Sequence, residues 1–417
     1  MRKVAIIGAG PSGCFTAQGL LKARPDWQVD VYDSLPVPYG LVRYGVAADH
    51  QGTKGIARQF ERVFERQGAR FFGNVTLGRD VTLEQMRAAY DAVVLATGLA
   101  GDRVPELVEG GDTPEGMIGA GALTRALYDH PDAADLPDIG GHVVILGNGN
   151  VSVDLLRLLA KSESELEGSD LSPRATEWLM SRRIDSLTIV GRSAAELAKF
   201  DPVMIRELAK LQAVTIRVAD LPEGEMPDAG KEKLLSALRE IDGLSTGPLP
   251  ITFRFNMPLQ SIQIKDGKVT GLVAGQDGSE GEYLPCDALV TAIGFCCDGR
   301  LGRDAVMSGA EDAEAGRIAE GLYAAGWFRR GPRGTIPENR ADSLALAARI
   351  VDDLEAVPET SRAGHEGLGL TCETVDHAGW QRLDAIEKAQ AMAGRCRTKI
   401  PTRPDMLRLA QKIEELK

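Results

Sequence analysis

Two segments of the chain share one pattern: a short apolar run, then closely spaced glycines, then the start of a helix. The first is VAIIGAGPSG (Val4–Gly13) and the second is VVILGNGNVS (Val143–Ser152). In this order a strand leads through a tight turn into a helix whose first N–H groups can hold a pyrophosphate. One such glycine fingerprint is a weak signal, but two in one chain indicate two dinucleotide sites. Two bound dinucleotides are what a hydride relay requires.

The composition is that of a soluble enzyme with more than one domain. A chain of 417 residues is long for one core, and its 43% hydrophobic and 26% charged residues are ordinary for a globular protein. The net charge of −12 argues against nucleic acid as a main partner. No apolar run is long enough to span a membrane, and a first strand starting at Arg2 or Lys3 leaves no room for a signal peptide. We therefore expect a cytoplasmic protein without a membrane partner.

The cysteines do not suggest a metal site or a redox pair. All six lack metal-ligand spacing, and no Cys-x-x-Cys is present. Cys296 and Cys297 are adjacent, which is a poor geometry for a reversible disulfide. We expect reduced thiols and no bound metal.

The chain predicts an α/β fold of two Rossmann-like, three-layer dinucleotide-binding domains. A strand, a helix and a second strand ending at Asp33 form one βαβ unit, and the cycle restarts at His142. DAVVLATG (91–98) is repeated as DALVTAIG (287–294), which suggests two similar halves. GLYAAGW (321–327) is expected to return the chain to the first domain. The predicted FAD domain is then 1–102 with 295–417, and the NADP domain 103–294 is inserted into it.

Other elements are predicted from apolar spacing. Residues 251–255, 259–265 and 268–274 read as an antiparallel ribbon, and 52–67 has helical spacing. The stretch 329–343 reads as a loop that precedes a helix over 344–355.

The first fingerprint predicts an FAD site. Gly8 would form the turn, Gly10 would admit the pyrophosphate, and Gly13 would let helix and strand pack closely. Asp33 lies twenty residues past Gly13, where a carboxylate can accept hydrogen bonds from ribose hydroxyls. A position at the start of the chain favours FAD over NAD. The same site is expected to include Pro11, Ser12, Thr97 and Gly98.

The second fingerprint predicts a nicotinamide site. Gly147 and Gly149 match the first two glycines, and Ser152 replaces the third, which would hold helix and strand slightly apart. The neighbouring strand ends at Arg192 rather than at an acid. A guanidinium can bind a 2′-phosphate that a carboxylate would repel, so we expect NADPH in preference to NADH. Asn148 completes this loop.

At these residues the chain resembles the adrenodoxin reductase type of ferredoxin–NADP reductase, along nearly its whole length. LPVPYGLVRYGVAADH (Leu35–His50) resembles the stretch that follows the FAD ribose acid in that family. GNGNVSVD (Gly147–Asp154) resembles its nicotinamide loop, and GWFRRGPRGTI (Gly326–Ile336) its late FAD loop. Disulfide-reductase relatives have Gly-Asp in place of Gly326 and Trp327.

The resemblance implies roles for further residues. His50 and Asp154 match residues near the nicotinamide and flavin that tune electron transfer, and His50 is expected to relay protons to solvent. Backbone N–H groups near Ile336 would stabilise negative charge on the reduced ring. Gly334 is expected near both cofactors. The remaining FAD contacts would be Gly40, Leu41, Val81, Trp327 and Thr335, and the remaining NADP contacts Asn150 and Val151.

The chain departs from the family at three places. Ser193 stands where the family often has a second arginine for the 2′-phosphate, Met204 where it has a glutamate, and Asp33 where glutamate is commoner. The lost arginine bears on the preference for NADPH and leaves the FAD expectation unchanged.

The expected activity is electron transfer from NADPH through FAD to a one-electron carrier. This transfer requires the nicotinamide and flavin rings to be stacked, and it requires no nucleophile from the protein. The carrier is expected to be an acidic ferredoxin or a flavodoxin, and a monooxygenase system is one destination for its electrons. A quinone or disulfide reductase, the electron-input subunit of a larger flavoprotein complex and a non-catalytic nucleotide sensor stay open as alternatives. Basic residues that could dock the carrier are Arg206, Lys210, Arg239, Arg182 and Arg183.

Overall fold

The computed structural model describes residues 1–108, 113–276, 278–297 and 302–411. They form two units. Unit 1 contains Met1–Gly101, Tyr128–Asp132 and Phe295–Lys417, and unit 2 contains Asp102–Leu127 and Ala133–Gly294. The short stretch Tyr128–Asp132 groups with unit 1, an interruption of the region 103–294 that no sequence pattern predicts.

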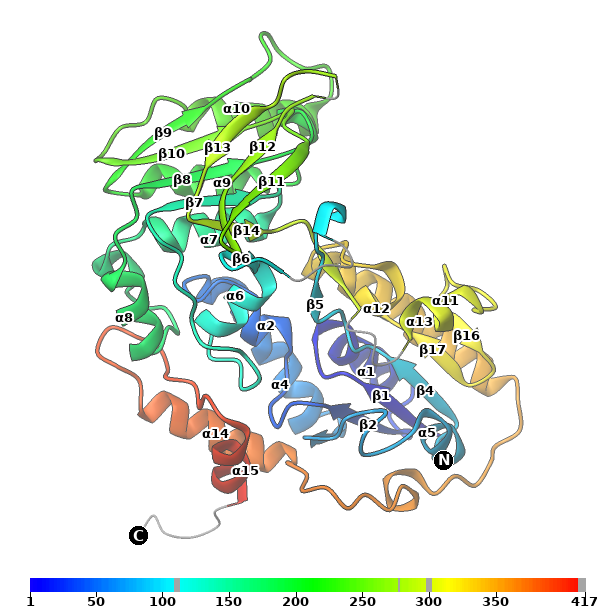
Figure 1. The fold of residues 1–417 in the computed structure, drawn as a ribbon. Helices are drawn as coiled ribbons and strands as arrows, with labels where there is room; N and C mark the ends of the chain where they lie inside the picture. The colour runs from blue at the N-terminus through cyan, green and yellow to red at the C-terminus, as the bar shows by residue number, and fades with distance from the viewer. Residues whose placement is uncertain (109–112, 277, 298–301, 412–417) are drawn as a thin grey trace. The chain divides into compact units, whose positions relative to one another are not determined.

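Unit 1 is a doubly wound unit built on a six-stranded sheet, labelled in Figure 1. The strand order is β16-β17-β4-β1-β2-β3, and all neighbours are parallel except β16 and β17. Its strands are β1 (Lys3–Ile7), β2 (Gln28–Asp33), β3 (Arg70–Gly73), β4 (Ala92–Leu95), β16 (Arg317–Ala319) and β17 (Leu322–Ala324).

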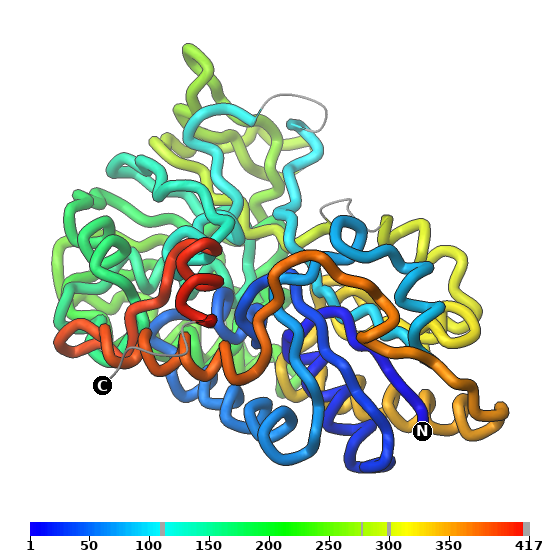
Figure 2. Tube along the Cα trace, turned by 90° about the horizontal axis from the view of Figure 1, so that it is seen from below, coloured from blue at the N-terminus to red at the C-terminus, as the bar shows by residue number. Residues whose placement is uncertain are grey.

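The longest helix of unit 1 is α13 (Ile336–Glu355), which packs closely on α1 (Pro11–Ala23) because Gly19 leaves room for Ala347 and Leu344. Near the C-terminus, α14 (His377–Ala389) lies beside α4 (Ala57–Glu65) (Figure 2), where His377 bonds to Glu61 at 3.0 Å. The other helices are α2 (Leu41–Tyr44), α3 (Gln51–Lys54), α5 (Leu83–Ala89), α11 (Arg303–Ser308), α12 (Gly326–Arg330) and α15 (Arg403–Gln411).

Unit 2 has a second six-stranded sheet, in the order β6-β14-β7-β8-β10-β9, and every neighbouring pair is parallel. Its strands are β6 (Met117–Gly119), β7 (His142–Leu146), β8 (Ser186–Val190), β9 (Val214–Val218), β10 (Leu249–Arg254) and β14 (Ala288–Thr291). Its helices are α6 (Ala120–Leu127), α7 (Asn150–Ala160), α8 (Pro173–Ser181), α9 (Pro202–Glu207) and α10 (Ala229–Ile241).

A three-stranded antiparallel ribbon packs on one face of this second sheet. It consists of β11 (Leu259–Lys265), β12 (Lys268–Ala274) and β13 (Glu282–Pro285). Leu272 of β12 shares a buried apolar cluster with Val144 and Leu289 of the sheet. Two further short strands, β5 (Gly101–Asp102) and β15 (Phe295–Cys296), lie where the chain passes from one unit to the next.

The two parallel sheets confirm the predicted α/β class with two Rossmann-like halves, but three element predictions were wrong. Residues 251–255 belong to β10, a parallel strand of the main sheet, because alternation alone does not distinguish a ribbon strand from an inner strand. The span 52–67 is broken at Gly55 into α3 and α4. The predicted loop over 329–343 is already helical from Ile336, where a capping box of Thr335 and Glu338 starts α13.

None of the described helices is long and apolar enough to cross a bilayer.

Candidate nucleotide sites

The first fingerprint follows β1, which lies between β2 and β4, at the point where the strand order of the sheet reverses. Gly8 has φ +113°, and a Cβ there would overlap the carbonyl oxygen of Ala96. A Cβ at Gly13 would overlap the Gly8 carbonyl, so both positions require glycine. At Gly10 an added Cβ would meet no atom within 4 Å. The loop therefore presents open backbone at the start of α1, whose N-cap Gly10 supplies no side-chain cap.

Other predicted FAD residues of unit 1 lie at this loop. The N–H of Tyr39 donates to the Ala9 carbonyl at 2.9 Å, and a Cβ on Gly40 would lie 3.3 Å from the Gly10 Cα. Gly326 approaches so closely that a Cβ there would overlap the Ser12 hydroxyl. The late segment that contains Trp327 thus returns to the first fingerprint.

The Trp327 side chain fits a cofactor site. Its ring is tilted against Phe295 with centroids 5.5 Å apart, and its buried Nε1 has no hydrogen-bond partner among the described residues. A buried indole N–H without an acceptor is costly, and a bound group can supply that acceptor. Thr97 is exposed and Val81 is buried in the core of unit 1.

Asp33 is at the end of β2, and its carboxylate has backbone partners. Its two oxygens accept N–H groups of Ala9 at 2.8 Å and of Leu35 at 2.9 Å. Burial raises the pKa of Asp33 to about 6, although these two bonds act in the opposite direction. Asp33 therefore fixes the fingerprint loop, and each oxygen keeps a second lone pair for a ribose hydroxyl.

The second fingerprint has the same place in unit 2. It follows β7, which lies between β14 and β8. Gly147 has φ +134°, and a Cβ there would overlap the Ala292 carbonyl, just as Gly8 is packed against Ala96. Gly149 again faces open space at the N-cap of α7.

At the third position the two fingerprints differ. Ser152 is completely buried, and its hydroxyl donates to the Gly147 carbonyl at 2.7 Å. A Cβ thus fits at Ser152, whereas a Cβ at Gly13 would not fit. This difference agrees with the looser packing of helix on strand that we expected at the second fingerprint.

Polar groups without partners mark the second site as well. Both polar atoms of the Asn148 side chain are buried and unbonded among the described residues, and the side chain packs on Gly191. Asn150 accepts the N–H of Asp201 at 2.7 Å. Arg192 is exposed and forms no ion pair within the described part of the chain.

Lys199 also lies at this loop, although no sequence pattern predicts it there. The backbone N–H of Lys199 donates to the Asn148 carbonyl at 2.7 Å, and Lys199 forms an isolated parallel β-bridge with Gly149. Its side chain is exposed and has no carboxylate partner among the described residues. A second cation thus borders the glycine loop in the chain that lacks the second arginine. Spacing could not reveal it, because the loop Gly191–Phe200 must first fold back on Asn148.

His50 and Asp154 belong to different units. His50 is the N-cap of α3 and half-buried in unit 1. Asp154 is in the second turn of α7 in unit 2 and accepts a hydrogen bond from Arg157 at 2.8 Å.

The chain resembles known reductases over its full length. Residues 2–213 match the family model described as pyridine nucleotide-disulphide oxidoreductase. The cindoxin reductase of Citrobacter braakii is 41% identical, with 98% of this chain and 91% of the relative covered. The mitochondrial NADPH:adrenodoxin oxidoreductase of Drosophila melanogaster is 33% identical, with 98% and 93% covered.

A solved structure of another reductase is similar to this chain over its full length. Mycobacterium tuberculosis FprA in complex with NADPH superposes with a TM-score of 0.88 and 31% identity, over 99% of this chain and 100% of that one. The chain belongs to the pyridine nucleotide-disulphide oxidoreductase family, and within it to the adrenodoxin and ferredoxin reductases.

Proposed function

We propose that this protein is an NADPH-dependent flavoprotein reductase that delivers electrons to a ferredoxin-type carrier. The observation that carries the proposal is the pair of open glycine loops, one at the strand-order reversal of each sheet. The relatives are named as reductases of cindoxin and adrenodoxin, and FprA was solved with NADPH. FAD and NADPH are accordingly the two dinucleotides.

The electron balance defines the reaction. NADPH gives up a hydride, which is two electrons and one proton, and two carrier molecules each take one electron while the proton is released. FAD, when bound, supplies the group that accepts electrons in pairs and gives them up singly. No covalent bond to the protein is needed.

We assign FAD to unit 1. Gly8, Gly10 and Gly13 would bring the backbone to its pyrophosphate, with Pro11 and Ser12 opening the helix. The other contacts would be Asp33, Gly40, Leu41, Val81, Thr97, Gly98, Trp327, Gly334, Thr335 and Ile336.

We assign NADPH to unit 2. Gly147, Asn148 and Gly149 would hold the pyrophosphate, and Asn150 and Val151 would lie along it. Arg192 would bind the 2′-phosphate, with Lys199 as the second cation in place of the missing arginine. Ser193 carries no charge, so it cannot replace the second arginine as a cation.

His50 and Asp154 are proposed to tune electron transfer, His50 by exchanging protons with solvent. The test is a substitution of His50 by Gln, which should shift the pH dependence of carrier reduction more than its maximal rate. The cytoplasm is the proposed location.

The disulfide reductase alternative has little support in the structure. All six cysteines lie in described segments, and none forms a disulfide. Cys14, nearest to the first fingerprint, is buried and its thiol donates to the Ala9 carbonyl.

Stopped-flow spectroscopy tests the proposal. The oxidised flavin band of the purified protein should bleach on anaerobic addition of NADPH, and an acidic [2Fe–2S] ferredoxin should restore it. A protein that binds FAD but does not bleach with NADPH or NADH would contradict the enzyme assignment and favour a nucleotide sensor. Bleaching that only a disulfide substrate reverses would favour the disulfide reductase.

A further inference from the structure

Tyr39 has an unusual backbone conformation for its residue type. Its φ is +83°, a left-handed value that is unfavourable for a bulky side chain. The other five non-glycine residues with positive φ in the described part of the chain are asparagine or aspartate, which tolerate this region better. A strained residue keeps such a conformation only where its surroundings fix it. The contacts of Tyr39 should therefore show what this strain serves.

The backbone of Tyr39 joins two parts of the proposed FAD site. Its N–H donates to the carbonyl of Ala9, in the first fingerprint, at 2.9 Å. The next residue, Gly40, also has positive φ, and a Cβ there would lie 3.3 Å from the Gly10 Cα. Because Gly40 and Leu41 follow Tyr39 directly, a rotation about its φ would displace both of them from the fingerprint.

The side chain of Tyr39 is buried against two helices, α4 and α14. Its ring is edge-on to Trp380 of α14, with the centroids 5.7 Å apart, and tilted against Phe60 of α4 at 5.9 Å. Its hydroxyl donates to the carboxylate of Glu61, the next residue of α4. All of these residues belong to unit 1. The side chain is thus fixed to α4 and α14, while the backbone is bonded to the fingerprint.

The carboxylate of Glu61 accepts hydrogen bonds from three described side chains. Besides the Tyr39 hydroxyl, the Nε2 atom of His377 lies 3.0 Å from Oε1, and the indole N–H of Trp380 donates to Oε2 at 3.4 Å. Burial acts to raise the pKa of Glu61, but the hydrogen bonds from His377 and Tyr39 outweigh it and bring the pKa below its usual value. Glu61 is therefore a charged acceptor that connects α14 to Tyr39.

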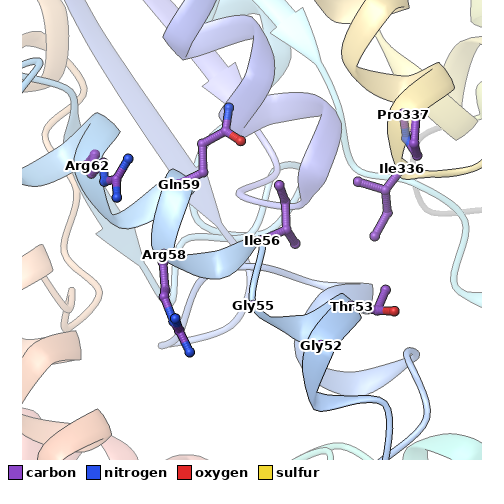
Figure 3. Close-up of a pocket in the computed structure, with 9 residues that line it drawn as sticks. All are labelled: Gly52, Thr53, Gly55, Ile56, Arg58, Gln59, Arg62, Ile336 and Pro337. Atoms are coloured by element: carbon purple, nitrogen blue, oxygen red, sulfur yellow. The ribbon is translucent and has the colours of Figure 1, made fainter.

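Another face of α4 forms one wall of a pocket, opposite the first turn of α13 (Figure 3). The pocket has a volume of about 550 Å³, and its lining includes Gln59 of α4 and Ile336 of α13. Residues two positions apart on a helix do not share a face, so Gln59 borders the pocket while Glu61 meets Tyr39 and α14. Helix α4 therefore links the Glu61 contacts to a wall beside Ile336, which the proposed function places at the flavin.

We propose that Glu61 is a positioning residue for FAD. Together with α14 it holds Tyr39 at positive φ, and so keeps the loop of Gly40 and Leu41 formed against the first fingerprint. A loop that is already fixed in its binding conformation loses less freedom when the ligand binds, which increases affinity. The inference rests on the assignment of FAD to unit 1 and identifies a group outside the site that sets FAD retention.

The test measures FAD release from the purified, FAD-loaded protein after dilution, followed by the fluorescence of free flavin. Glu61→Gln keeps the shape of the side chain and removes its charge, and Tyr39→Phe removes only the hydroxyl. Each change should speed FAD release about tenfold, because a hydrogen bond to a charged group is weakened or lost. Hydrogen–deuterium exchange in the peptide that covers residues 38–46 should become faster in both variants.

The double variant shows whether the two residues act as one unit. In Y39F/E61Q, FAD release should be at most about twofold faster than in Tyr39→Phe, because the bond from Tyr39 to Glu61 is already absent there. If Glu61 only packed α14 on α4, its effect would be independent of the Tyr39 hydroxyl, and the two accelerations would multiply.

Glu65→Gln is the matched control. Glu65 is an exposed residue of the same helix and accepts a hydrogen bond from Gln381 of α14 at 2.8 Å. The same chemical change thus alters a contact between α4 and α14 that does not involve Tyr39. Both FAD release and exchange in residues 38–46 should stay within about twofold of the unmodified protein.

FAD release at the unmodified rate in Glu61→Gln or in Tyr39→Phe would overturn the proposal. An equal acceleration in Glu65→Gln, or accelerations that multiply in the double variant, would overturn it as well. In each of these cases the protein still holds FAD, so the proposed function stands. A purified protein that takes up no FAD would remove the proposed function and this inference together.

Discussion

The hydroxyl of Ser152 donates a 2.7 Å hydrogen bond to the carbonyl oxygen of Gly147, inside the glycine loop of unit 2. The equivalent position in unit 1 is Gly13, where no side chain fits against the Gly8 carbonyl. One sequence pattern is thus realised in two packings, a tight one that we assign to FAD and a looser one that we assign to NADPH.

The Ser152 contact can be tested by changing its size. Ser152→Ala loses one buried hydrogen bond and should cost about 1 kcal/mol of unfolding free energy, with little change in the KM for NADPH. Ser152→Val adds a branched side chain at a fully buried position and should displace the loop, raising that KM about tenfold. Flavin content should be normal in both variants. Loss of flavin from the valine variant would mean that the two units are not independent.

The 2′-phosphate assignment can be tested with the two cations at the loop. Arg192→Ala and Lys199→Ala should each raise the KM for NADPH about tenfold or more, since a hydrogen bond to a charged group contributes about 1.5–3 kcal/mol. The KM for NADH should stay the same, because NADH lacks that phosphate. Lys210→Ala is the control for an exposed lysine of unit 2. Equal losses with both coenzymes would remove the residue from the phosphate site.

The glycine requirement of the first fingerprint gives a third prediction. Gly8→Ala should leave a protein with little bound FAD, because the new Cβ overlaps the Ala96 carbonyl on a backbone with φ +113°. Gly68→Ala is the control, since Gly68 also has positive φ, +88°, but its Cβ would enter open space. Flavin absorbance per protein measures the difference. Equal FAD loss in both variants would point to backbone strain rather than to the fingerprint packing.

The sequence was sufficient to predict the features that depend on neighbouring residues alone. The glycine pattern located both loops, because a turn that requires positive φ and close packing has few solutions other than glycine. Element boundaries were less predictable where two local signals compete. Gly55 breaks a helical pattern between Lys54 and Ala57, and the start of α13 at Ile336 depends on a capping box inside a glycine-rich stretch.

Long-range contacts were beyond the sequence. Arg206 of α9 pairs with Glu240 of α10, and Arg239 of α10 pairs with Glu232 two turns earlier in the same helix. The sequence alone could not show that these two positive charges are paired. Lys199 reaches the fingerprint only through the return of its loop to Asn148. The backbone partners of Asp33 are likewise visible only once Ala9 and Leu35 are in place.

Thiol chemistry gives a fourth prediction. Burial raises the pKa of Cys14 well above its usual value and that of Cys286 to about 12. The thiolate is the reactive form of cysteine, so at pH 8 both thiols should resist a disulfide reagent in the native protein. Raising the pH to 9 should not make either of them reactive. Cys396 is exposed and should react first. Fast reaction of Cys14 would show that the loop at Ala9 opens in solution.

The buried carboxylate of Glu387 should matter more than any surface charge of α14. Glu387 is fully buried and accepts hydrogen bonds from Arg43, from Arg397 at 3.2 Å and from the Ile400 N–H at 3.0 Å. Glu387→Gln leaves the buried Arg43 guanidinium without its countercharge and should cost about 3–5 kcal/mol of unfolding free energy.

Arg43 is in α2, two residues after Leu41, so the same change should weaken FAD retention. Lys388→Gln on the same helix breaks only an exposed pair with Asp384 and should cost about 0.5 kcal/mol or less. Denaturant unfolding followed by flavin fluorescence measures both effects in one experiment. A Glu387 variant as stable as the Lys388 variant would mean that water or a rearranged side chain compensates Arg43, and that α14 does not hold the FAD loop in place.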